Sequence, residues 1–243
     1  MRSDFRSEVR PDLRSVFVIG TDTGVGKSLV SAALLRGAVQ AGLRAVGMKP
    51  VAAGLDLQPD GSRACGDVLA LQAAGNVAAD PALVNPFCLP DPLSPHLAAR
   101  RAGRRITLAP IVAAHRALCA QADRVIVEGA GGFLVPLDEG DGDPAPGAPL
   151  LTGADLAQAL GVPLVLVVGL RLGCLNHALL TAEVLRARGL TLAGWVANRI
   201  DPAMACADEN LDFLRRHIPA PLLADVPHAS CWPQGWQPSL FLS

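Results

Sequence analysis

Lysine is scarce in this sequence of 243 residues, which contains only Lys27 and Lys49 and otherwise uses arginine for permanent positive charge. Both lysines come directly after apolar runs, beside glycine or proline. A lysine ammonium is a compact, rotatable charge, whereas the arginine guanidinium is a planar fork. Lysine at these two places therefore points to contacts with transferring phosphates. The alternative is chance in an arginine-rich composition, and it is tested by the residues around each lysine.

An excess of one charge is also missing, because 21 Lys and Arg are balanced by 22 Asp and Glu to a net charge of −1. The chain therefore has no excess of positive charge that would attract nucleic acid or an anionic membrane surface. The longest apolar run, residues 162–170, is far too short to span a bilayer. We therefore expect neither nucleic acid nor a membrane as a partner.

The six cysteines are scattered and form no C-x-x-C pair, so neither a zinc site nor a disulfide framework is indicated. A reduced, cytoplasmic location fits this pattern. Residues 1–14 contain acids and arginines without an apolar run, so we expect no secretory signal there. We predict a mobile N-terminal extension over residues 1–14 and a single domain over residues 15–243, since 51% hydrophobic residues can form one substantial core.

Apolar strand candidates alternate with helical segments along the chain. The expected strands are residues 15–20, 45–48, 124–127, 163–168, 192–197 and 221–224. The expected helices are residues 27–41, 67–74, 109–121, 155–160, 175–188 and 207–217. Strands that are apolar throughout and separated by helices predict a doubly wound α/β fold, with a mainly parallel sheet covered by helices on both faces. Residues 139–149, rich in Gly, Pro and Asp, predict a surface loop.

The first lysine ends a turn of glycines and hydroxyl residues, G-T-D-T-G-V-G-K-S from Gly20, between a predicted strand and a predicted helix. Backbone N–H groups in such a turn, together with the helix N-terminus, bind phosphate. Lys27 would reach the β- and γ-phosphates and Ser28 would give its hydroxyl to Mg²⁺. The common pattern has glycine where this chain has Thr21, so the loop is a lengthened variant. The alternative is a glycine-rich turn without a ligand.

A second candidate group is acidic. The apolar strand ending in Glu128 would place a carboxylate at the C-terminal edge of the sheet, where open α/β folds bind ligands. Beside a phosphate loop such an acid holds Mg²⁺ directly or through water, and the following G-A-G-G lets the backbone approach a substrate. The alternative is a solvated acid at a strand end. Asp67 stands at a predicted helix start, where periodicity alone favours a helix cap.

Five segments together resemble the dethiobiotin synthetase family in order and spacing. They read G-T-D-T-G-V-G-K-S, M-K-P-V-A-A-G, V-E-G-A-G-G, L-G-C-L-N-H and A-G-W-V-A-N, and they begin at Gly20, Met48, Val127, Leu172 and Ala193. The resemblance runs over residues 16–229. The lengthened phosphate loop alone is shared with partitioning ATPases and amidotransferase-linked synthetases, and the other four segments narrow the resemblance to this family.

The resemblance implies an ATP-dependent ring-closing ligase of biotin biosynthesis with a P-loop NTPase-like fold. In such enzymes carbon dioxide, or bicarbonate as its source, gives a carbamate on one amine of 7,8-diaminononanoate, ATP phosphorylates the carbamate, and the second amine closes the cyclic urea. This chemistry asks mainly for charge stabilisation and positioning, with ATP and Mg²⁺ as implied cofactors. The alternative is a non-ligase ATP-binding switch or regulatory ATPase of the same fold.

Motif position implies a role for each residue of the site. Lys27 would cradle the phosphates, Lys49 would neutralise the carbamate and the transferring phosphoryl group, and Thr23 would bond the γ-phosphate. The implied ATP-binding residues, with Asn198 reading adenine, are Gly24, Val25, Gly26, Lys27, Ser28, Leu29, Asp67, Glu128, Gly131, Asn198, Pro227, His228 and Ala229. The implied magnesium set is Ser28, Asp67 and Glu128, which replaces the helix-cap interpretation of Asp67.

The implied substrate-binding residues are Ala53, Gly131, Gly173, Cys174 and Asn176. Gly173, Cys174 and Asn176 lie at the start of a helix whose N–H groups suit the distant carboxylate of the substrate. In the family this helix comes from the partner subunit, so the resemblance implies a homodimer with sites at its interface. Ala53 stands where the family often has serine. Losing one neutral hydrogen bond costs about 0.5–1.5 kcal/mol, so weaker substrate binding is expected rather than loss of the reaction.

Overall fold

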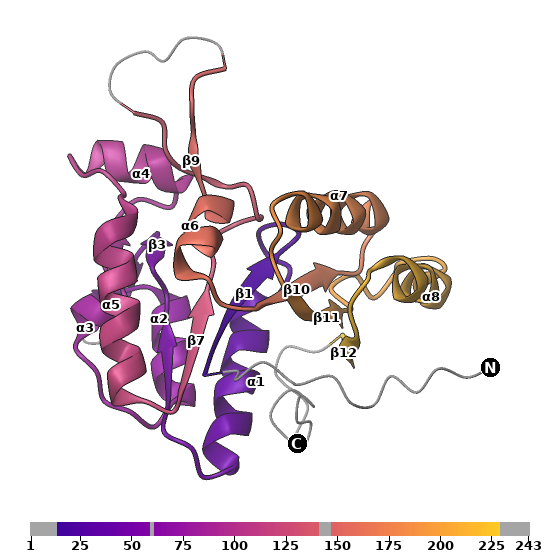
Figure 1. Ribbon diagram of the computed structural model, residues 1–243, viewed down its shortest axis with the longest axis horizontal. Helices are drawn as coiled ribbons and strands as arrows, with labels where there is room; N and C mark the ends of the chain where they lie inside the picture. The colour runs from indigo at the N-terminus through magenta and orange to yellow at the C-terminus, as the bar shows by residue number, and fades with distance from the viewer. Residues whose placement is uncertain (1–13, 59–60, 141–146, 229–243) are drawn as a thin grey trace.

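The protein is built around a six-stranded sheet in which all neighbouring strands run parallel (Figure 1). The computed structural model describes residues 14–58, 61–140 and 147–228. The strand order across the sheet is β12 (Leu222–Val226), β11 (Leu192–Asn198), β10 (Leu164–Gly169), β1 (Ser15–Gly20), β7 (Arg124–Glu128) and β2 (Ala45–Met48). Because β1, β7 and β2 are neighbours, the residues that follow these three strands meet at one edge of the sheet.

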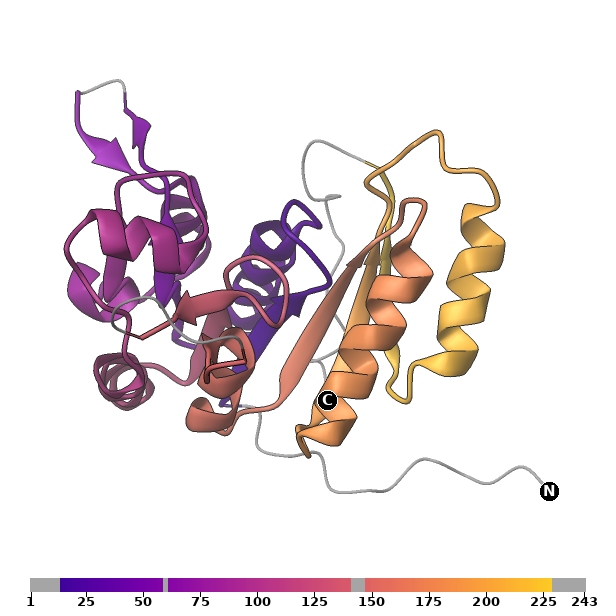
Figure 2. The same ribbon diagram turned by 90° about the horizontal axis from the view of Figure 1, so that it is seen from above.

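Helices connect the strands and cover both faces of the sheet. The helices of the described residues are α1 (Lys27–Gln40), α2 (Gly66–Ala74), α3 (Pro81–Val84), α4 (Pro95–Arg101), α5 (Leu108–Gln121), α6 (Gly153–Leu160), α7 (Cys174–Ala187) and α8 (Ala207–His217). Three short pairs of strands complete the fold. They are β3 (Val51–Ala53) with β6 (Phe87–Leu89), β4 (Asp56–Leu57) with β5 (Arg63–Ala64), and β8 (Pro136–Asp138) with β9 (Leu151–Thr152). Figure 2 shows the β4–β5 hairpin projecting from the body of the molecule.

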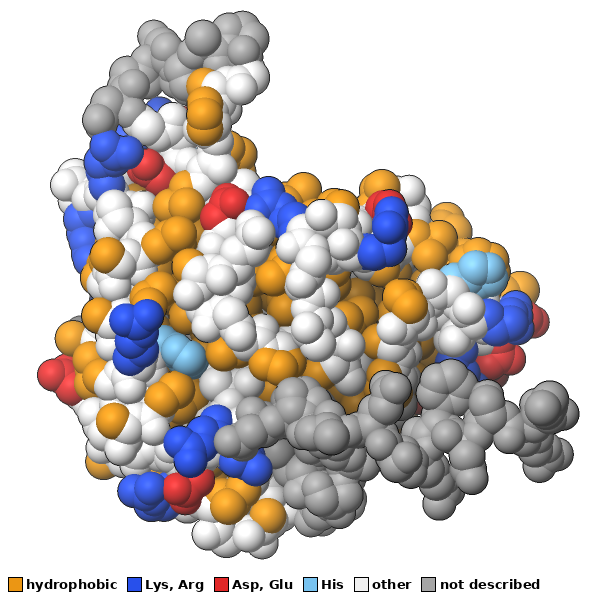
Figure 3. Space-filling view, viewed as in Figure 1, with side chains coloured by type: hydrophobic (Ala, Val, Ile, Leu, Met, Phe, Trp, Pro, Cys, Tyr) orange, Lys and Arg blue, Asp and Glu red, His pale blue; other side chains and the backbone are white. Residues whose placement is uncertain are grey.

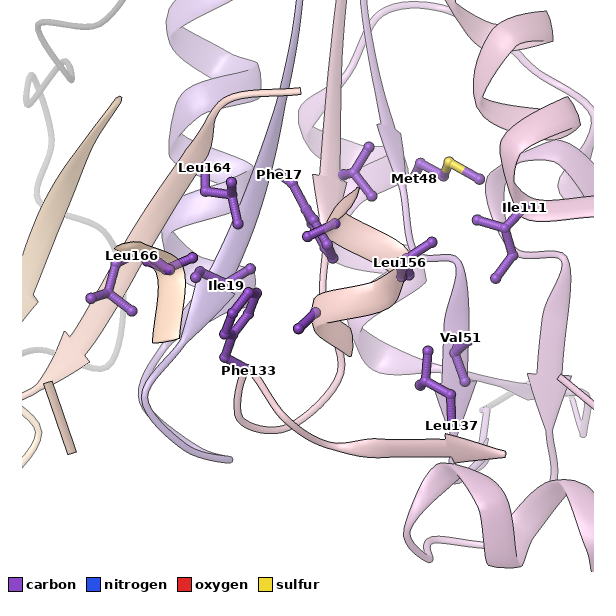
Figure 4. Packing of buried hydrophobic residues seen from close by; sticks show 14 of the residues in the cluster. Phe17, Ile19, Met48, Val51, Ile111, Phe133, Leu137, Leu156, Leu164 and Leu166 are labelled. Carbon is purple, nitrogen blue, oxygen red and sulfur yellow. The ribbon is translucent and has the colours of Figure 1, made fainter. Parts of the chain in front are cut away.

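Two apolar clusters lie on opposite faces of the sheet, because successive side chains of a strand point to opposite sides. Phe17 and Ile19 of β1 belong to the larger cluster, with residues of α4, α5, α6, α7 and α8. Figure 4 shows part of this cluster around Phe17 and Leu156. Val16 and Val18 belong to the second cluster, with residues of α1 and α2. The predicted doubly wound α/β fold is therefore confirmed.

The structure adds several elements to those predicted. The short strands β3 to β6, β8 and β9 and the helix α3 were not expected, because two to four residues show no hydrophobic period. Strand β7 extends to Glu128 itself. Of the predicted loop 139–149, residues 141–146 lie outside the described residues. So do residues 1–13 of the predicted extension and Ala229, and the division of the chain at residue 14 stays a prediction.

The described surface is mixed in charge. On the face shown in Figure 3, basic side chains lie in small separate groups, several with an acidic side chain alongside. Among the described side chains on this face there is no continuous basic surface of the kind that a nucleic-acid backbone requires. Within the described ranges, no helix is long and apolar enough to cross a membrane.

A buried serine and histidine lie at the edge of the sheet opposite the phosphate loop. The Ser15 hydroxyl donates to the carbonyl of Val125 at 3.0 Å and lies 2.8 Å from Nε2 of His115. Because the one hydroxyl hydrogen of Ser15 goes to Val125, Nε2 of His115 carries a proton and donates to Ser15. Burial, aided by the charge of Arg116, lowers the pKa of His115 from its ordinary value of 6.5.

We predict that His115 makes the protein less stable in acid. Since the pKa of folded His115 is lowered, the unfolded chain takes up its proton first, and the stability that neutral His115 provides is lost as the pH falls below about 6.5. His115→Gln, whose amide can still donate to Ser15, should unfold in urea with a smaller stability loss between about pH 7.5 and about pH 5 than the wild-type protein. His177→Gln is the matched control, and an equal pH dependence in all three proteins would contradict this explanation.

Candidate nucleotide and metal site

The phosphate loop is the turn between β1 and α1. Gly24 and Gly26 have φ of 73° and 95°, a region that suits glycine, and Gly26 caps α1. The loop packs closely against Gly20. A Cβ at this position would lie 2.8 Å from Cγ2 of Val25 and 3.1 Å from Cδ of Lys27, which leaves no room for a side chain. The loop thus has the strand, glycine turn and helix start that the sequence predicted. This geometry directs backbone N–H groups toward one anion.

Lys27, the first residue of α1, folds back over its own loop. Its ammonium donates to the carbonyl of Asp22 at 2.9 Å and to that of Gly131 at 2.7 Å, which joins the phosphate loop to the glycine segment after β7. The side chain is buried. Burial, and then the like charge of Lys49, lower the pKa of Lys27 from 10.5 to about 8. An anion beside Lys27 would therefore be a favourable partner.

Lys49 follows β2 and reaches across to the end of β7. Its Nζ lies 2.5 Å from Oε1 of Glu128 and 2.7 Å from Oδ2 of Asp67, and it also donates to the carbonyl of Gly129 at 3.2 Å. Only 4% of Lys49 and none of Glu128 is exposed. Charge-assisted contacts of this kind are strong where water is excluded.

Ser28 connects this ion pair to the phosphate loop. Its Oγ lies 2.6 Å from Oδ1 of Asp67 and 2.8 Å from Oε1 of Glu128. A hydroxyl has a single hydrogen, so the two carboxylates compete for it. The structure therefore brings Ser28, Lys49, Asp67 and Glu128 together from α1, the turn after β2, α2 and β7, and we call these four residues the cation cluster.

The protonation of the cation cluster follows from burial and from its own charges. Burial alone would lower the pKa of Lys49, but the charges of Glu128 and Asp67 outweigh it and raise the pKa. Burial would raise the pKa of Asp67, yet the charge and hydrogen bond of Lys49 and the hydrogen bond of Ser28 bring it below its ordinary value. Burial raises the pKa of Glu128 against the opposing charge of Lys49. Lys49 is thus protonated and Asp67 ionised at neutral pH.

The donor set of the cation cluster fits magnesium that arrives with a nucleotide. Oε2 of Glu128 is buried without a hydrogen-bond partner, so one carboxylate oxygen is available. The described part of the chain has no cluster of three or more His, Cys, Asp and Glu residues suited to a metal. Mg²⁺ in nucleotide sites uses one or two carboxylates together with phosphate oxygens, so the hydroxyl of Ser28 and two carboxylates are a sufficient protein contribution.

Asp67 does not cap its helix. Helix α2 begins at Gly66, its N-cap is Cys65, and no side chain makes the cap hydrogen bond. Asp67 instead directs one carboxylate oxygen to Ser28 and the other to Lys49. The helix-cap interpretation from periodicity is wrong, because these two contacts use both oxygens of Asp67.

Asn198, at the end of β11, lies against the phosphate loop. Its Nδ2 donates to the carbonyl of Val25 at 2.9 Å, and a Cβ on Gly26 would lie 2.2 Å from that nitrogen. Beyond β12, Pro227 and His228 are exposed, and Nδ1 of His228 lies 3.0 Å from the carbonyl of Arg199. The adenine role of these residues stays a prediction, as does that of Leu29 in the first turn of α1.

A groove of about 350 Å³ lies beside the phosphate loop. It is lined by Thr21, Thr23, residues 131–135 and four residues of α7, namely His177, Leu180, Thr181 and Val184. Thr23 is exposed, and its backbone N–H donates to Asp22. The predicted residues Thr23 and Gly131 therefore share one groove.

The predicted substrate residues of α7 do not line this groove within one chain. Gly173 caps α7 with φ of 95°, and Cys174 is buried as an ordinary apolar residue. Asn176 is exposed and borders a second hollow together with Leu180 and Glu183. Ala53 is half-buried at the end of β3.

Sequence reasoning missed one contact at the loop. Asp22 accepts a hydrogen bond from Arg171 at 2.5 Å, which connects the phosphate loop to the turn before α7. Asp22 lies in the loop that the sequence predicted, but Arg171 is one of many arginines in this chain, and nothing in the sequence marks it as the partner of Asp22. The contact between the carbonyl of Gly129 and Lys49 was also missed. Every residue has a backbone carbonyl, so the sequence does not show which one accepts a hydrogen bond.

Comparisons with known proteins agree with this geometry. Residues 14–231 match the model of the AAA domain family. The chain is 54% identical over 219 residues to the ATP-dependent dethiobiotin synthetase BioD of Aromatoleum aromaticum, which covers 89% of this chain and 92% of that relative.

Solved structures of lower identity share the fold. A ParA family ATPase from Chlorobium tepidum has a TM-score of 0.53 at 14% identity, covering 90% of this chain and 86% of its own. The septum site-determining protein MinD of Pyrococcus horikoshii, complexed with Mg-ADP, has a TM-score of 0.51 at 14% identity, with 89% and 82% covered. At this identity the likeness shows the P-loop NTPase-like fold alone.

We predict that the two loop glycines differ in their tolerance of alanine. Gly24→Ala adds a Cβ that meets nothing within 4 Å, so its only penalty is positive φ, about 1–2 kcal/mol. Gly26→Ala has the same strain and also displaces Asn198 from Val25, which should add at least about 1 kcal/mol. Urea unfolding of both variants without ligand measures the difference. Equal losses of stability would show that the contact between Gly26 and Asn198 does not constrain the loop.

Proposed function

The chain belongs to the dethiobiotin synthetase family, and from this premise we propose that it is an ATP-dependent ligase that makes dethiobiotin from 7,8-diaminononanoate and carbon dioxide, with ADP and phosphate as the other products. One observation supports this reaction most directly. A second ammonium, that of Lys49, lies on the carboxylate of Glu128, which also contacts Ser28 of the phosphate loop. A nucleotide switch has no evident need for a second ammonium facing the γ-phosphate, whereas joining a carbamate to a triphosphate brings two anions together, and a second ammonium stabilises them.

The proposed reaction has three steps, namely carbamate formation, phosphoryl transfer and ring closure. One amine of the substrate attacks carbon dioxide and loses a proton, which leaves a carbamate. A carbamate oxygen then attacks the γ-phosphorus of ATP, and ADP departs. Finally the second amine attacks the carbamoyl carbon, phosphate leaves, and the loss of a proton completes the cyclic urea. Each step places negative charge beside the ammonium groups of Lys27 and Lys49, so electrostatic stabilisation and positioning carry the catalysis.

We assign roles to the residues on this basis. Lys27, Thr23 and the loop N–H groups hold the phosphates, and Lys49 stabilises the carbamate and the transferring phosphoryl group. Ser28, Asp67 and Glu128 would hold Mg²⁺, which supplies charge neutralisation to the phosphates when bound. Asn198, Pro227 and His228 would flank the base.

The substrate half of the site is proposed to come from two subunits. Gly173, Cys174 and Asn176 do not line the groove of their own chain, while Leu172 before α7 and Leu180 in its middle are 95% and 58% exposed. Exposed leucines on and beside one helix favour burial against a second copy of the chain. In a homodimer, Gly173, Cys174 and Asn176 of one subunit would bind the substrate carboxylate in the site of the other.

The function is tested by mass spectrometry of the products. Purified protein supplied with diaminononanoate, bicarbonate, ATP and Mg²⁺ should form dethiobiotin and ADP in equal amounts. Lys49→Gln should lose about 10²–10³-fold in turnover, the usual effect of removing one group that stabilises transition-state charge, while it still binds ATP.

Arg44→Gln is the control for loss of a positive charge, because Arg44 precedes β2 at the opposite edge of the sheet and pairs with Asp123 on the surface. It should leave turnover unchanged. ADP release by the wild-type protein without dethiobiotin would refute the ligase and favour a nucleotide-dependent switch.

The shared site is tested by mixing two inactive variants. Lys49→Gln removes the carbamate ammonium, and Asn176→Glu places a carboxylate where the substrate carboxylate would bind. Random reassortment makes half of the dimers mixed, and each mixed dimer has one intact site. Co-expression should therefore restore roughly a quarter of wild-type activity, by the symmetry of a two-fold dimer. If each chain forms its whole site alone, no mixed dimer has an intact site and activity stays absent.

A further inference from the structure

Lys49 has no donor left for a substrate. An ammonium has three N–H bonds, and three acceptors surround it, namely Oε1 of Glu128, Oδ2 of Asp67 and the carbonyl of Gly129. A carbamate or phosphoryl oxygen can bond Lys49 only if at least one of these contacts breaks. The proposed catalytic role of Lys49 therefore requires a change of partners.

Glu128 restricts how that change can happen. Its side chain is fully buried, and Lys49 is the cation that touches it among the described residues. A buried carboxylate that loses its only counter-ion is strongly destabilising. Lys49 can therefore leave an ionised Glu128 only when another positive charge takes its place.

The same carboxylates have room for that cation. Oε2 of Glu128 is buried and makes no hydrogen bond, and the Oγ atom of Ser28 lies within hydrogen-bonding distance of both Glu128 and Asp67. Hydroxyl and carboxylate oxygens are the ligands that Mg²⁺ prefers. The carboxylates of Glu128 and Asp67 thus contact the Lys49 ammonium and are also proposed ligands of Mg²⁺.

We propose that Lys49 and Mg²⁺ exchange on Glu128 and Asp67, so that the metal entering with the nucleotide releases the Lys49 ammonium toward the carbamate. This inference rests on the proposed function, because it deepens the role of Lys49 in that reaction. Before the metal enters, Lys49 is the internal counter-ion of the cluster and is unavailable to the diamine carbamate. The exchange makes Lys49 competent only after the metal and nucleotide have bound, which couples substrate recognition to the cofactor.

Lys27 provides a matched comparison inside the same site. It carries the same charge and is similarly buried, but its ammonium donates to the backbone carbonyls of Asp22 and Gly131 and bonds no carboxylate of the described residues. Removing Lys27 removes a nearby repulsive charge from the metal position. Removing Lys49 removes that charge and also frees both carboxylates.

The first test measures Mn²⁺ binding to the nucleotide-free protein by electron paramagnetic resonance of free Mn²⁺. Lys49→Met should bind Mn²⁺ at least about tenfold more tightly than the wild-type protein, since close charge pairs have coupling energies of this size or larger. Lys27→Met should tighten Mn²⁺ binding by less than Lys49→Met does, because its loss removes a repulsive charge but frees neither carboxylate of the cation cluster. Unchanged or weaker binding by Lys49→Met would overturn the exchange.

A second test needs no change at Lys49. Because the chain has only two lysines, protein labelled with ¹³C at the lysine ε-carbon gives two signals, and the spectrum of Lys27→Met assigns them. Adding Mg²⁺ with a non-hydrolysable ATP analogue should shift the Lys49 signal. The analogue in EDTA should leave the Lys49 signal in place. A Lys49 signal that ignores Mg²⁺ would overturn the exchange even if Lys49→Met fails to fold.

The outcomes separate this inference from the proposed function. Dethiobiotin formation without a metal-dependent Lys49 signal would sink the exchange and leave the ligase standing. A metal-dependent Lys49 signal without dethiobiotin would support the exchange and remove the ligase.

Discussion

The carboxylate of Glu128, buried at the end of β7, is the constraint on which the site depends. A fully buried charge must be paired and hydrogen-bonded, and Glu128 meets this requirement with the ammonium of Lys49 and the hydroxyl of Ser28. Lys49 lies in the turn after β2, and Ser28 lies in the first turn of α1. The pairing of the Glu128 carboxylate therefore fixes the phosphate loop and the second lysine beside each other.

The order of the strands makes this pairing possible. Because β7 lies between β1 and β2, its terminal residue is the only strand end that borders both the phosphate loop and Lys49 in the described sheet. The glycine segment after Glu128 then contacts the phosphate loop, where the carbonyl of Gly131 accepts a hydrogen bond from Lys27. One short segment thus contacts both lysines, because the carbonyl of Gly129 accepts from Lys49 and that of Gly131 from Lys27.

Much of this arrangement was predictable from sequence because it follows simple periods and motifs. The apolar strands, the loop before Lys27 and the acid at the end of β7 each leave a local signal. Periodicity alone did not predict the contacts of Asp67, since a position at a helix start fits a cap equally well. The family resemblance favoured the cluster with Ser28 and Glu128, and the contacts of Asp67 with Ser28 and Lys49 exclude the cap. Nor could sequence show that Lys49 is fully occupied, because the carbonyl of Gly129 is a backbone atom whose position depends on the fold.

In the exchange proposed above, Glu128 holds Lys49 until a metal replaces it. A crystal structure with Mg²⁺ and a non-hydrolysable ATP analogue tests this most directly through the distance between Nζ of Lys49 and Oε1 of Glu128, now 2.5 Å. We expect Mg²⁺ beside Ser28 and Glu128, with Lys49 moved beyond hydrogen-bonding range, more than about 3.5 Å, toward the γ-phosphate. Mg²⁺ and nucleotide bound with Lys49 still on Glu128 would contradict it.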